Sequence, residues 1–258
     1  MNLLRTAARA LALFTLAATL AAPADARTLE EIRKDGRIVI ATEGAFAPFN
    51  FFEGKQLTGF EIDVANAIAA KMGVKPEWKA IGFDALLAGL QQGRWDMVIA
   101  SHGITEERAK AVTFADPHYC SGGVIVAKDS RIRGAGDLAG RKVAVQTGTT
   151  YLDNVKKIAG VAEVKNFPQD ADARNALATG RVDAWVTDRF VAKQALAAHP
   201  GAGMKMGDFL FVERIASAVA KGNQPLVAEI DRALAAIMAD GTYAAISKKW
   251  FHEDVRCK

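Results

Sequence analysis

An acidic side chain beside aromatic residues is the first candidate for ligand chemistry in this chain of 258 residues. Glu43 and Phe46 lie in the stretch 42–49, TEGAFAPF, directly after the apolar run 37–41. A carboxylate with aromatic neighbours suits a small cationic or zwitterionic ligand, because both the charge and the ring faces attract a cation. A surface turn whose aromatics pack into the core explains this stretch equally well.

Arg108 is the candidate group for binding a carboxylate. It stands three residues after Thr105, and this spacing predicts a helix that Thr105 caps. A guanidinium can hold a carboxylate through two parallel hydrogen bonds. Taken alone, the simpler interpretation is a surface ion pair between Arg108 and Glu106.

The segment 146–150, QTGTT, lies between a predicted strand and a predicted helix. Free backbone N–H groups and hydroxyls at the start of a helix suit an anion such as a carboxylate. The spacing GxxxxGK[ST] of a phosphate loop is absent. Asp188 follows the strand 182–187 and is expected to face the same crevice, although an aspartate there can equally cap the helix that follows it.

Other kinds of site find little support. Ser101 stands beside His102 without the GxSxG pattern of a nucleophile elbow, and the four histidines have no spacing that predicts a catalytic partner. Neither the histidines nor the two cysteines have the spacing of a zinc site, so we predict no metal and no cofactor. The net charge of +4 comes from 33 basic and 29 acidic residues without a basic run, which argues against nucleic acid as a partner.

The elements that must position these residues alternate between strands and helices. Half of the residues are hydrophobic, as in an ordinary folded protein, and the length permits one large domain or two smaller ones. Alternation of this kind favours an α/β fold with parallel sheets covered by helices. The predicted strands are 37–41, 75–79, 95–100, 142–145, 164–167 and 182–186. The predicted helices are 60–72, 84–92, one that begins at Thr149 and Thr150, 172–179, 188–198 and 224–250, the last with a break at Gly241.

One internal similarity suggests two lobes. The segment 87–98, LAGLQQGRWDMV, resembles 176–185, ALATGRVDAW. In both, a helix ends at a glycine, and an arginine, an apolar residue and an aspartate then lead into a strand. Joints of this kind are common in α/β proteins, but here they point to two lobes with the same βα plan. A ligand between such lobes binds at the carboxyl ends of strands and the N-termini of helices.

The first 26 residues have the pattern of a cleaved secretory signal peptide. Arg5 and Arg9 precede an apolar run, and the sequence Ala24-Asp25-Ala26 supplies a cleavage site before Arg27. The run is shorter than the roughly 20 apolar residues of a membrane anchor. No cysteine follows it, so a lipoprotein anchor is not supported. We therefore expect export of the chain.

Several segments, in order, resemble one known family. The most specific is 59–69, GFEIDVANAIA, and FADPHY (114–119), VQTGTT (145–150) and DAWVTD (183–188) match further blocks. On these segments the chain resembles the periplasmic solute-binding proteins of amino-acid ABC transporters, the group that includes the lysine/arginine/ornithine, histidine and glutamine binding proteins. The resemblance extends from residue 37 to residue 251.

The resemblance implies the two-lobed type II periplasmic-binding-protein fold, in which each lobe is a mostly parallel sheet flanked by helices. Lobe 1 is expected at residues 27–119 and 217–258, and lobe 2 at 126–211. Two hinge strands, 120–125 and 212–216, are expected to join them. A protein of this kind works in the periplasm, binds an amino acid as a monomer when its lobes close, and delivers it to a membrane permease.

The resemblance also assigns roles around the main-chain groups of the ligand. Arg108 holds the α-carboxylate, helped by the backbone N–H groups of Gly103 and Thr150. Asp188 takes the α-ammonium, with the Ser101 carbonyl nearby. In the family a serine commonly stands where this chain has Gly103, so one hydrogen bond to the ammonium is missing or comes from water.

At the other end of the ligand, Phe46 and Phe83 occupy the positions that sandwich its side chain. Glu43 stands where the binders of basic amino acids usually carry an aspartate, one methylene shorter. A buried carboxylate without a partner is costly, and this favours lysine, arginine or ornithine over glutamine or histidine, with an acidic ligand least favoured.

The family plan brings the C-terminus back to lobe 1, near the first hinge strand. Cys120 and Cys257 are the only cysteines, and an exported chain meets an oxidising compartment. We therefore predict a disulfide between them; two free buried thiols are the alternative.

Two other function classes fit the same resemblance. Cyclohexadienyl dehydratases are similar to these binding proteins and need an acid in the cleft, for which Glu43 is a candidate. The Arg108 and Asp188 pair, which grips an amino acid, fits binding better. A sensor domain is the third class, but it usually precedes a transmembrane segment, and none follows Trp250.

Overall fold

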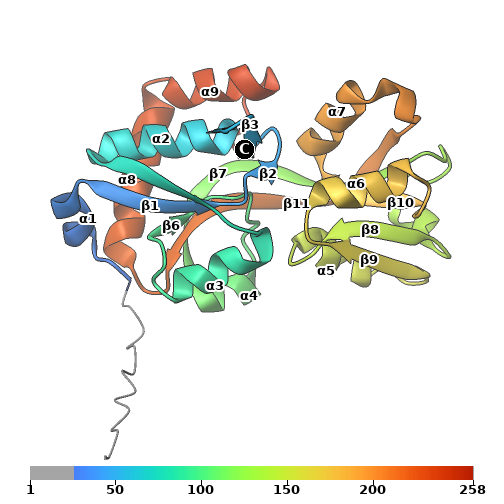
Figure 1. Cartoon of the computed structure of the whole chain (residues 1–258), viewed down its shortest axis with the longest axis horizontal. Helices are drawn as coiled ribbons and strands as arrows, with labels where there is room; N and C mark the ends of the chain where they lie inside the picture. Colours follow the sequence, from blue (N-terminus) through green and yellow to red (C-terminus); the bar gives the residue numbers. More distant parts are fainter. Residues whose placement is uncertain (1–25, 258) are drawn as a thin grey trace, which may run out of the picture.

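The computed structural model describes residues 26–257, and the predicted signal peptide lies outside these residues except for its final alanine. The molecule has two halves, and the first half is built from both ends of the chain. It contains three parallel strands: β1 (Arg37–Thr42), β5 (Lys75–Ala80) and β6 (Met97–Val98). Six helices surround them: α1 (Leu29–Asp35), α2 (Phe60–Met72), α3 (Leu86–Gln91), α4 (Glu106–Ala111), α8 (Gln224–Ala239) and α9 (Thr242–Phe251). Figure 1 shows α2 and α9 above the strands and α3 and α4 below them.

The second half repeats this plan at the other end of the molecule (Figure 1). Its parallel strands are β8 (Lys142–Gln146), β9 (Glu163–Phe167) and β10 (Ala184–Asp188), and its helices are α5 (Thr150–Lys156), α6 (Asp170–Ala178) and α7 (Arg189–Ala198). Short 3₁₀ turns lie at Phe83–Ala85, Ala135–Leu138 and Pro200–Ala202. The predicted α/β fold with mostly parallel sheets and covering helices is confirmed.

Two long strands run from one half into the other. They are β7 (Val112–Ala127) and β11 (Lys205–Ala220), each 16 residues long, and they pair with each other in antiparallel register from Lys205–Ala127 to Ala220–Val112. They join the parallel strands of both halves into one sheet with the order β5-β1-β6-β11-β7-β10-β8-β9. The expected hinge residues, 120–125 and 212–216, lie inside these two strands.

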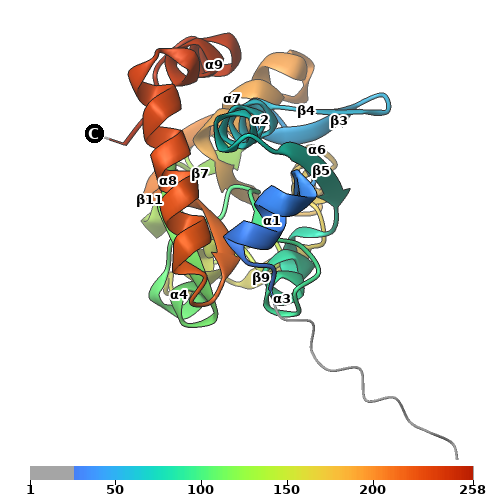
Figure 2. The same ribbon diagram turned by 90° about the vertical axis from the view of Figure 1, so that its left-hand side faces the viewer.

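A small three-stranded sheet carries one of the predicted ligand residues. It consists of β2 (Ala45–Phe46), β3 (Asn50–Glu53) and β4 (Gln56–Thr58), and Figure 2 shows the β3–β4 hairpin projecting beside α2. Gly59 connects it to α2 with φ 131°, and a Cβ there would lie 2.2 Å from the Phe49 carbonyl oxygen. Only glycine tolerates this combination, and it lets the Glu61 N–H donate to the Phe49 carbonyl (2.8 Å).

The internal sequence similarity corresponds to one structural joint used twice. In the first half, the Asp96 N–H donates to the Val39 carbonyl (2.9 Å), and the Asp96 carboxylate accepts from the Val39 N–H (2.7 Å). In the second half, the Asp183 N–H donates to the Lys142 carbonyl (2.8 Å), and its carboxylate accepts from the Lys142 N–H (2.7 Å). Each aspartate thus fixes the strand that follows against the first parallel strand of its half.

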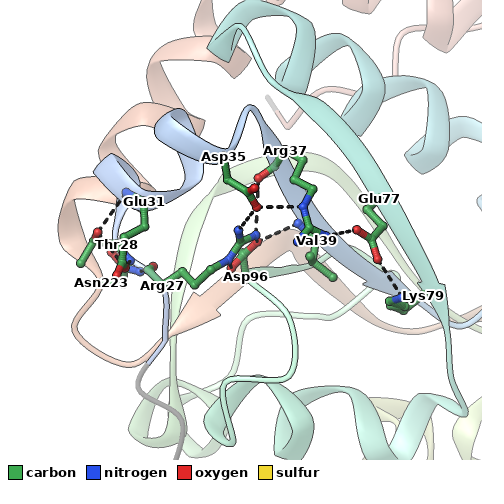
Figure 3. Close-up of polar contacts among 10 residues, drawn as sticks. All are labelled: Arg27, Thr28, Glu31, Asp35, Arg37, Val39, Glu77, Lys79, Asp96 and Asn223. Atoms are coloured by element: carbon green, nitrogen blue, oxygen red, sulfur yellow. Dashed lines mark hydrogen bonds and ion pairs between the residues drawn. The ribbon is translucent and has the colours of Figure 1, made fainter.

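The beginning of the described chain is fixed to the same joint (Figure 3). Arg27 forms an ion pair with the buried Asp96 carboxylate and a second one with Asp35 (2.8 Å). Thr28 and Glu31 then form a capping box at the start of α1, because each side chain accepts from the other's backbone N–H. Arg27 therefore belongs to the fold, directly after the predicted cleavage site.

Two predicted elements differ clearly from the structure, and one helix was not predicted. The helix expected at 84–92 is a 3₁₀ turn followed by α3, and α1 was not expected. In the strand expected at 95–100, Met97 and Val98 form the strand, while the Trp95 side chain turns away to pack on Gly89 and donates to the Leu86 carbonyl (3.1 Å). None of the helices in residues 26–257 is both long and apolar enough to span a membrane.

The predicted disulfide between Cys120 and Cys257 is present. It ties the C-terminal segment to β7, and the Cys120 N–H also donates to the Val255 carbonyl (3.1 Å). The two cysteines are 137 residues apart, so the bond restricts a long loop of the unfolded chain.

Replacing both cysteines by serine is expected to lower the free energy of unfolding by about 3 kcal/mol and the Tm by about 6–12 °C. Differential scanning calorimetry measures this, with dithiothreitol as the matched treatment, which should destabilise the original chain and leave the double variant unchanged. Equal melting temperatures for the two proteins would contradict the expectation.

Candidate functional site

One cavity between the two halves brings together most of the predicted ligand residues. About 260 Å³ of space between atoms lies there, part of it open to solvent. The first half contributes Glu43, Phe46, Phe83, Ser101 and Arg108, and the second half contributes Gln146, Thr149, Thr150 and Tyr151. Six of the eight predicted ligand residues therefore line this cavity. Gly103 and Asp188 are not among its lining residues.

The cavity lies where parallel strands end. Glu43 directly follows β1, and the short loop with Phe83 follows β5. Gln146 is the last residue of β8, and Ser101 comes soon after β6. The carboxyl ends of strands in both halves thus point to one place, which is where open α/β sheets bind ligands.

Arg108 connects the two halves across this cavity. Thr105 caps α4 by accepting from the Arg108 N–H (3.1 Å), as the sequence predicts. The guanidinium donates to the Gly103 carbonyl (2.8 Å) and to the Gly148 carbonyl of the second half (3.0 Å). The surface ion pair on this helix joins Lys110 and Glu107 instead. Arg108 is thus turned into the cavity, where its remaining N–H groups can meet a carboxylate.

Glu43 forms the second contact across the cavity. Its side chain is 8% exposed, and its Oε1 accepts a hydrogen bond from Gln146 Nε2 (2.6 Å). Burial raises the pKa of the Glu43 carboxyl to about 8, against the lowering effect of the Gln146 hydrogen bond and with a further rise from Asp170 and Asp84. The carboxyl is therefore protonated at pH 7 until a cation lies beside it.

Two aromatic rings form walls of the cavity. Phe83 stacks on His102 with ring centroids 4.4 Å apart and an interplanar angle of 13°. Burial lowers the pKa of His102 well below its usual range, so this ring is neutral and serves as support. Phe46 stacks on Phe49 at 5.7 Å, within the aromatic core of the first half. Both rings are fixed from behind and can contact an apolar side-chain stem.

Glu61 anchors the loop that carries Ser101. It is completely buried at the start of α2 and accepts from the Ser101 N–H (2.7 Å), the Ser101 hydroxyl (3.0 Å) and Asn50 Nδ2 (2.7 Å). His118 Nε2 lies 2.9 Å from Glu61 Oε1, the oxygen that also accepts from the Ser101 N–H. Ser101 has φ 55°, a conformation that is unfavourable for residues other than glycine. The hydrogen bonds of the Glu61 carboxylate, which belongs to the GFEIDV segment, compensate for this strain.

Asp188 has the capping role that the sequence left open. Its Oδ1 accepts from the Phe190 N–H (2.6 Å) at the start of α7. Its Oδ2 is buried and has no hydrogen-bond partner among the described residues. Burial raises the pKa of the Asp188 carboxyl to about 6, although the Ser121 hydroxyl and the backbone N–H of Phe190 lower it. The side chain is completely buried, is not among the cavity's lining residues, and has one oxygen without a donor among the described residues.

Three lining residues were not among the predicted ligand residues. Gln146 and Thr149 belong to the segment that the sequence identified as an anion site, but only Thr150 was chosen from it. Tyr151 follows Thr150 on the first turn of α5, and no pattern distinguished it. Within residues 26–257, no group of three or more His, Cys, Asp or Glu side chains is placed to hold a metal ion.

Residues 38–253 match the family model of bacterial extracellular solute-binding proteins, family 3. Among curated proteins, the chain is 32% identical over 237 residues to the L-cystine-binding protein TcyJ of Escherichia coli K12, covering 90% of this chain and 89% of that protein. Both the sequence and its length thus match a binding protein almost from end to end.

Solved structures agree. An ancestral arginine-binding protein bound to arginine superposes with a TM-score of 0.81 and 43% identity, covering 84% of this chain and 98% of that one. An ancestral amino-acid-binding protein, described as a precursor of cyclohexadienyl dehydratase, reaches a TM-score of 0.80 and 35% identity, covering 86% and 99%. The chain belongs to the bacterial extracellular solute-binding proteins of family 3 and is a binding protein rather than an enzyme.

Proposed function

We propose that this protein binds a cationic L-amino acid of the lysine, arginine or ornithine type and delivers it to the permease of an ABC transporter. The observation that carries the proposal is that one cavity contains both Arg108 and the buried carboxyl of Glu43. The first suits the α-carboxylate of an amino acid, and the second suits a distal cation. The similarity to an arginine-binding protein supports the same ligand class.

The roles of the cavity residues follow from their chemistry. Arg108 holds the α-carboxylate with the N–H groups of Gly103 and Thr150, while Asp188 and the Ser101 carbonyl accept from the α-ammonium. Phe46 and Phe83 contact the side-chain stem. A guanidinium or ammonium at its end ionises Glu43, because a neighbouring cation lowers a carboxyl pKa.

Binding is proposed to occur by closure of two lobes, lobe 1 at residues 27–119 and 217–258 and lobe 2 at residues 126–211. Segments 120–125 and 212–216, inside β7 and β11, act as the hinge. The contacts of Arg108 with Gly148 and of Glu43 with Gln146 join the two lobes in the closed form. We propose that the protein works as a monomer in the periplasm, after cleavage of the leader at residue 26.

The variant Glu43→Gln tests the ligand class. Both proteins are titrated by calorimetry with arginine, lysine, ornithine, glutamine, cystine and glutamate. The variant should bind the three cations at least about 10-fold more weakly than the original chain does, because a charged hydrogen bond is lost. Its affinity for glutamine should change less. Glu53→Gln, an exposed position on β3, is the matched control and should change nothing. Tight binding of glutamate by the original chain, without binding of arginine or lysine, would refute the cationic ligand.

A neutral polar amino acid is the second candidate. The Glu43 carboxyl, with a pKa of about 8 and a hydrogen bond from Gln146, can remain protonated and donate to a neutral ligand. The relative TcyJ is a cystine-binding protein. Proton release distinguishes the candidates: a cation displaces the Glu43 proton at pH 7, whereas a neutral ligand leaves it in place. Calorimetry in two buffers of different ionisation enthalpy measures this.

A further inference from the structure

A partly buried carboxylate, that of Glu213, lies beside one of the residues that line the cavity. Glu213 stands on β11, and its Oε2 accepts a hydrogen bond from the hydroxyl of Thr150 (2.8 Å), one of the lining residues. Its Oε1 is buried and has no hydrogen-bond partner among the described residues, although the Tyr151 hydroxyl is nearby. A buried carboxylate oxygen without a donor is unfavourable, so a donor from a ligand would stabilise it.

Gly103 makes room for this carboxylate. A Cβ at residue 103 would lie 2.1 Å from Glu213 Oε2 and 3.0 Å from its carboxyl carbon, so any larger residue would displace the Glu213 side chain. The Ile104 N–H, one residue later, donates to the Arg214 carbonyl (2.9 Å), which holds this loop against β11. The Glu213 carboxylate thus fills the space that a side chain at residue 103 would otherwise occupy.

The described groups around Glu213 do not supply a cation that donates a hydrogen bond to its free oxygen. Arg108 is on one side, but its guanidinium donates to two backbone carbonyls. Asp188, from β10, and Tyr151, from α5, are its other ionisable neighbours. Burial raises the pKa of the Glu213 carboxyl to about 7, and the Thr150 hydrogen bond lowers it. Asp188 has an unpartnered oxygen of its own, so two acidic acceptors in this region lack donors.

We propose that Glu213 binds the α-ammonium group of the ligand, together with Asp188. The inference rests on the proposed function, because it assumes an α-amino acid in the cavity, but it holds for any side chain. An ammonium has three N–H donors and can satisfy both free oxygens. Its positive charge then adds to that of Arg108 and offsets part of the negative charge of Glu213 and Asp188.

Removal of the ammonium from the ligand tests this directly. We compare arginine with 5-guanidinopentanoate, its analogue without the amino group, by calorimetry on the original chain, Glu213→Gln and Asp208→Asn. In Glu213→Gln the affinity for arginine should fall about 10-fold or more, while the affinity for the analogue stays within about twofold. Asp208, an exposed acid on the same strand, is the matched control and should leave both affinities unchanged.

Gly103→Ala provides an independent variant, since its methyl group displaces the Glu213 carboxylate and should produce the same selective loss. If thermal unfolding shows that Glu213→Gln does not fold, the comparison is made with Gly103→Ala instead. If the original chain binds arginine and both variants lose arginine and analogue equally, or lose neither, the inference is wrong and the proposed function stands. If the original chain binds no α-amino acid, glutamine and cystine included, the proposed function and the inference fail together.

Discussion

Replacing Arg108 by alanine is expected to weaken binding of the amino acid by at least about 100-fold. A bidentate contact between a guanidinium and a carboxylate contributes two charged hydrogen bonds, each of about 1.5–3 kcal/mol. Arg108→Lys should recover only part of this affinity, because an ammonium lacks the planar fork of the guanidinium. Isothermal titration calorimetry measures both variants.

Arg131→Ala is the matched control for charge, since this arginine lies on the surface in an ion pair with Asp129 and is 83% exposed. It should bind like the original chain. Thermal unfolding should show that Arg108→Ala remains folded, because Arg108 donates only to two loop carbonyls. Binding by Arg108→Ala within about threefold of the original would mean that another group holds the carboxylate.

Glu61→Ala is expected to have the largest effect on stability, lowering the free energy of unfolding by about 4 kcal/mol or more. The substitution leaves the donors of Asn50 and Ser101 buried without an acceptor, and it removes the partner of His118. Each such orphaned group costs about 1–3 kcal/mol, and the loss of one partner from a buried charged network is among the most destabilising changes known. Urea unfolding followed by tryptophan fluorescence measures it.

Glu30→Ala is a suitable comparison, because Glu30 also lies in the first turn of a helix but is exposed. Its effect should stay within about 0.5 kcal/mol. Glu61→Gln keeps an acceptor oxygen and should fall between the two. Should Glu61→Ala unfold at the same urea concentration as the original chain, the network would have no net value for stability.

Local patterns were sufficient to predict much of this site. Thr105 and Arg108 predicted a capped helix start, and the QTGTT segment predicted a strand followed by a helix; both are present because capping depends on neighbours three residues apart. The repeated glycine–arginine–x–aspartate joint predicted two similar halves, since the aspartate in each acts on an adjacent strand.

Features that depend on distant residues could not be predicted in this way. Gly103 looked like a missing hydrogen-bond acceptor for the ligand ammonium until the structure placed Glu213, 110 positions later in the chain, where a Cβ would have to be. The orientation of Arg108 toward the second half depends on the Gly148 carbonyl, which the crossing strands bring across the cavity. Asp188 was ambiguous in sequence because a helix cap and a ligand contact both require a carboxylate at the same place.

The pairing of β7 with β11 also has a consequence for how such proteins diversify. The chain enters the second half at Ala127 and returns at Lys205, and these two residues are paired across neighbouring strands. The intervening segment is therefore an insertion whose two ends meet. It contains Gln146 and Tyr151 but neither Glu43 nor Arg108. Recombination at these two adjacent points would exchange the cavity wall with Gln146, Thr150 and Tyr151 as a unit and leave Glu43 and Arg108 in place.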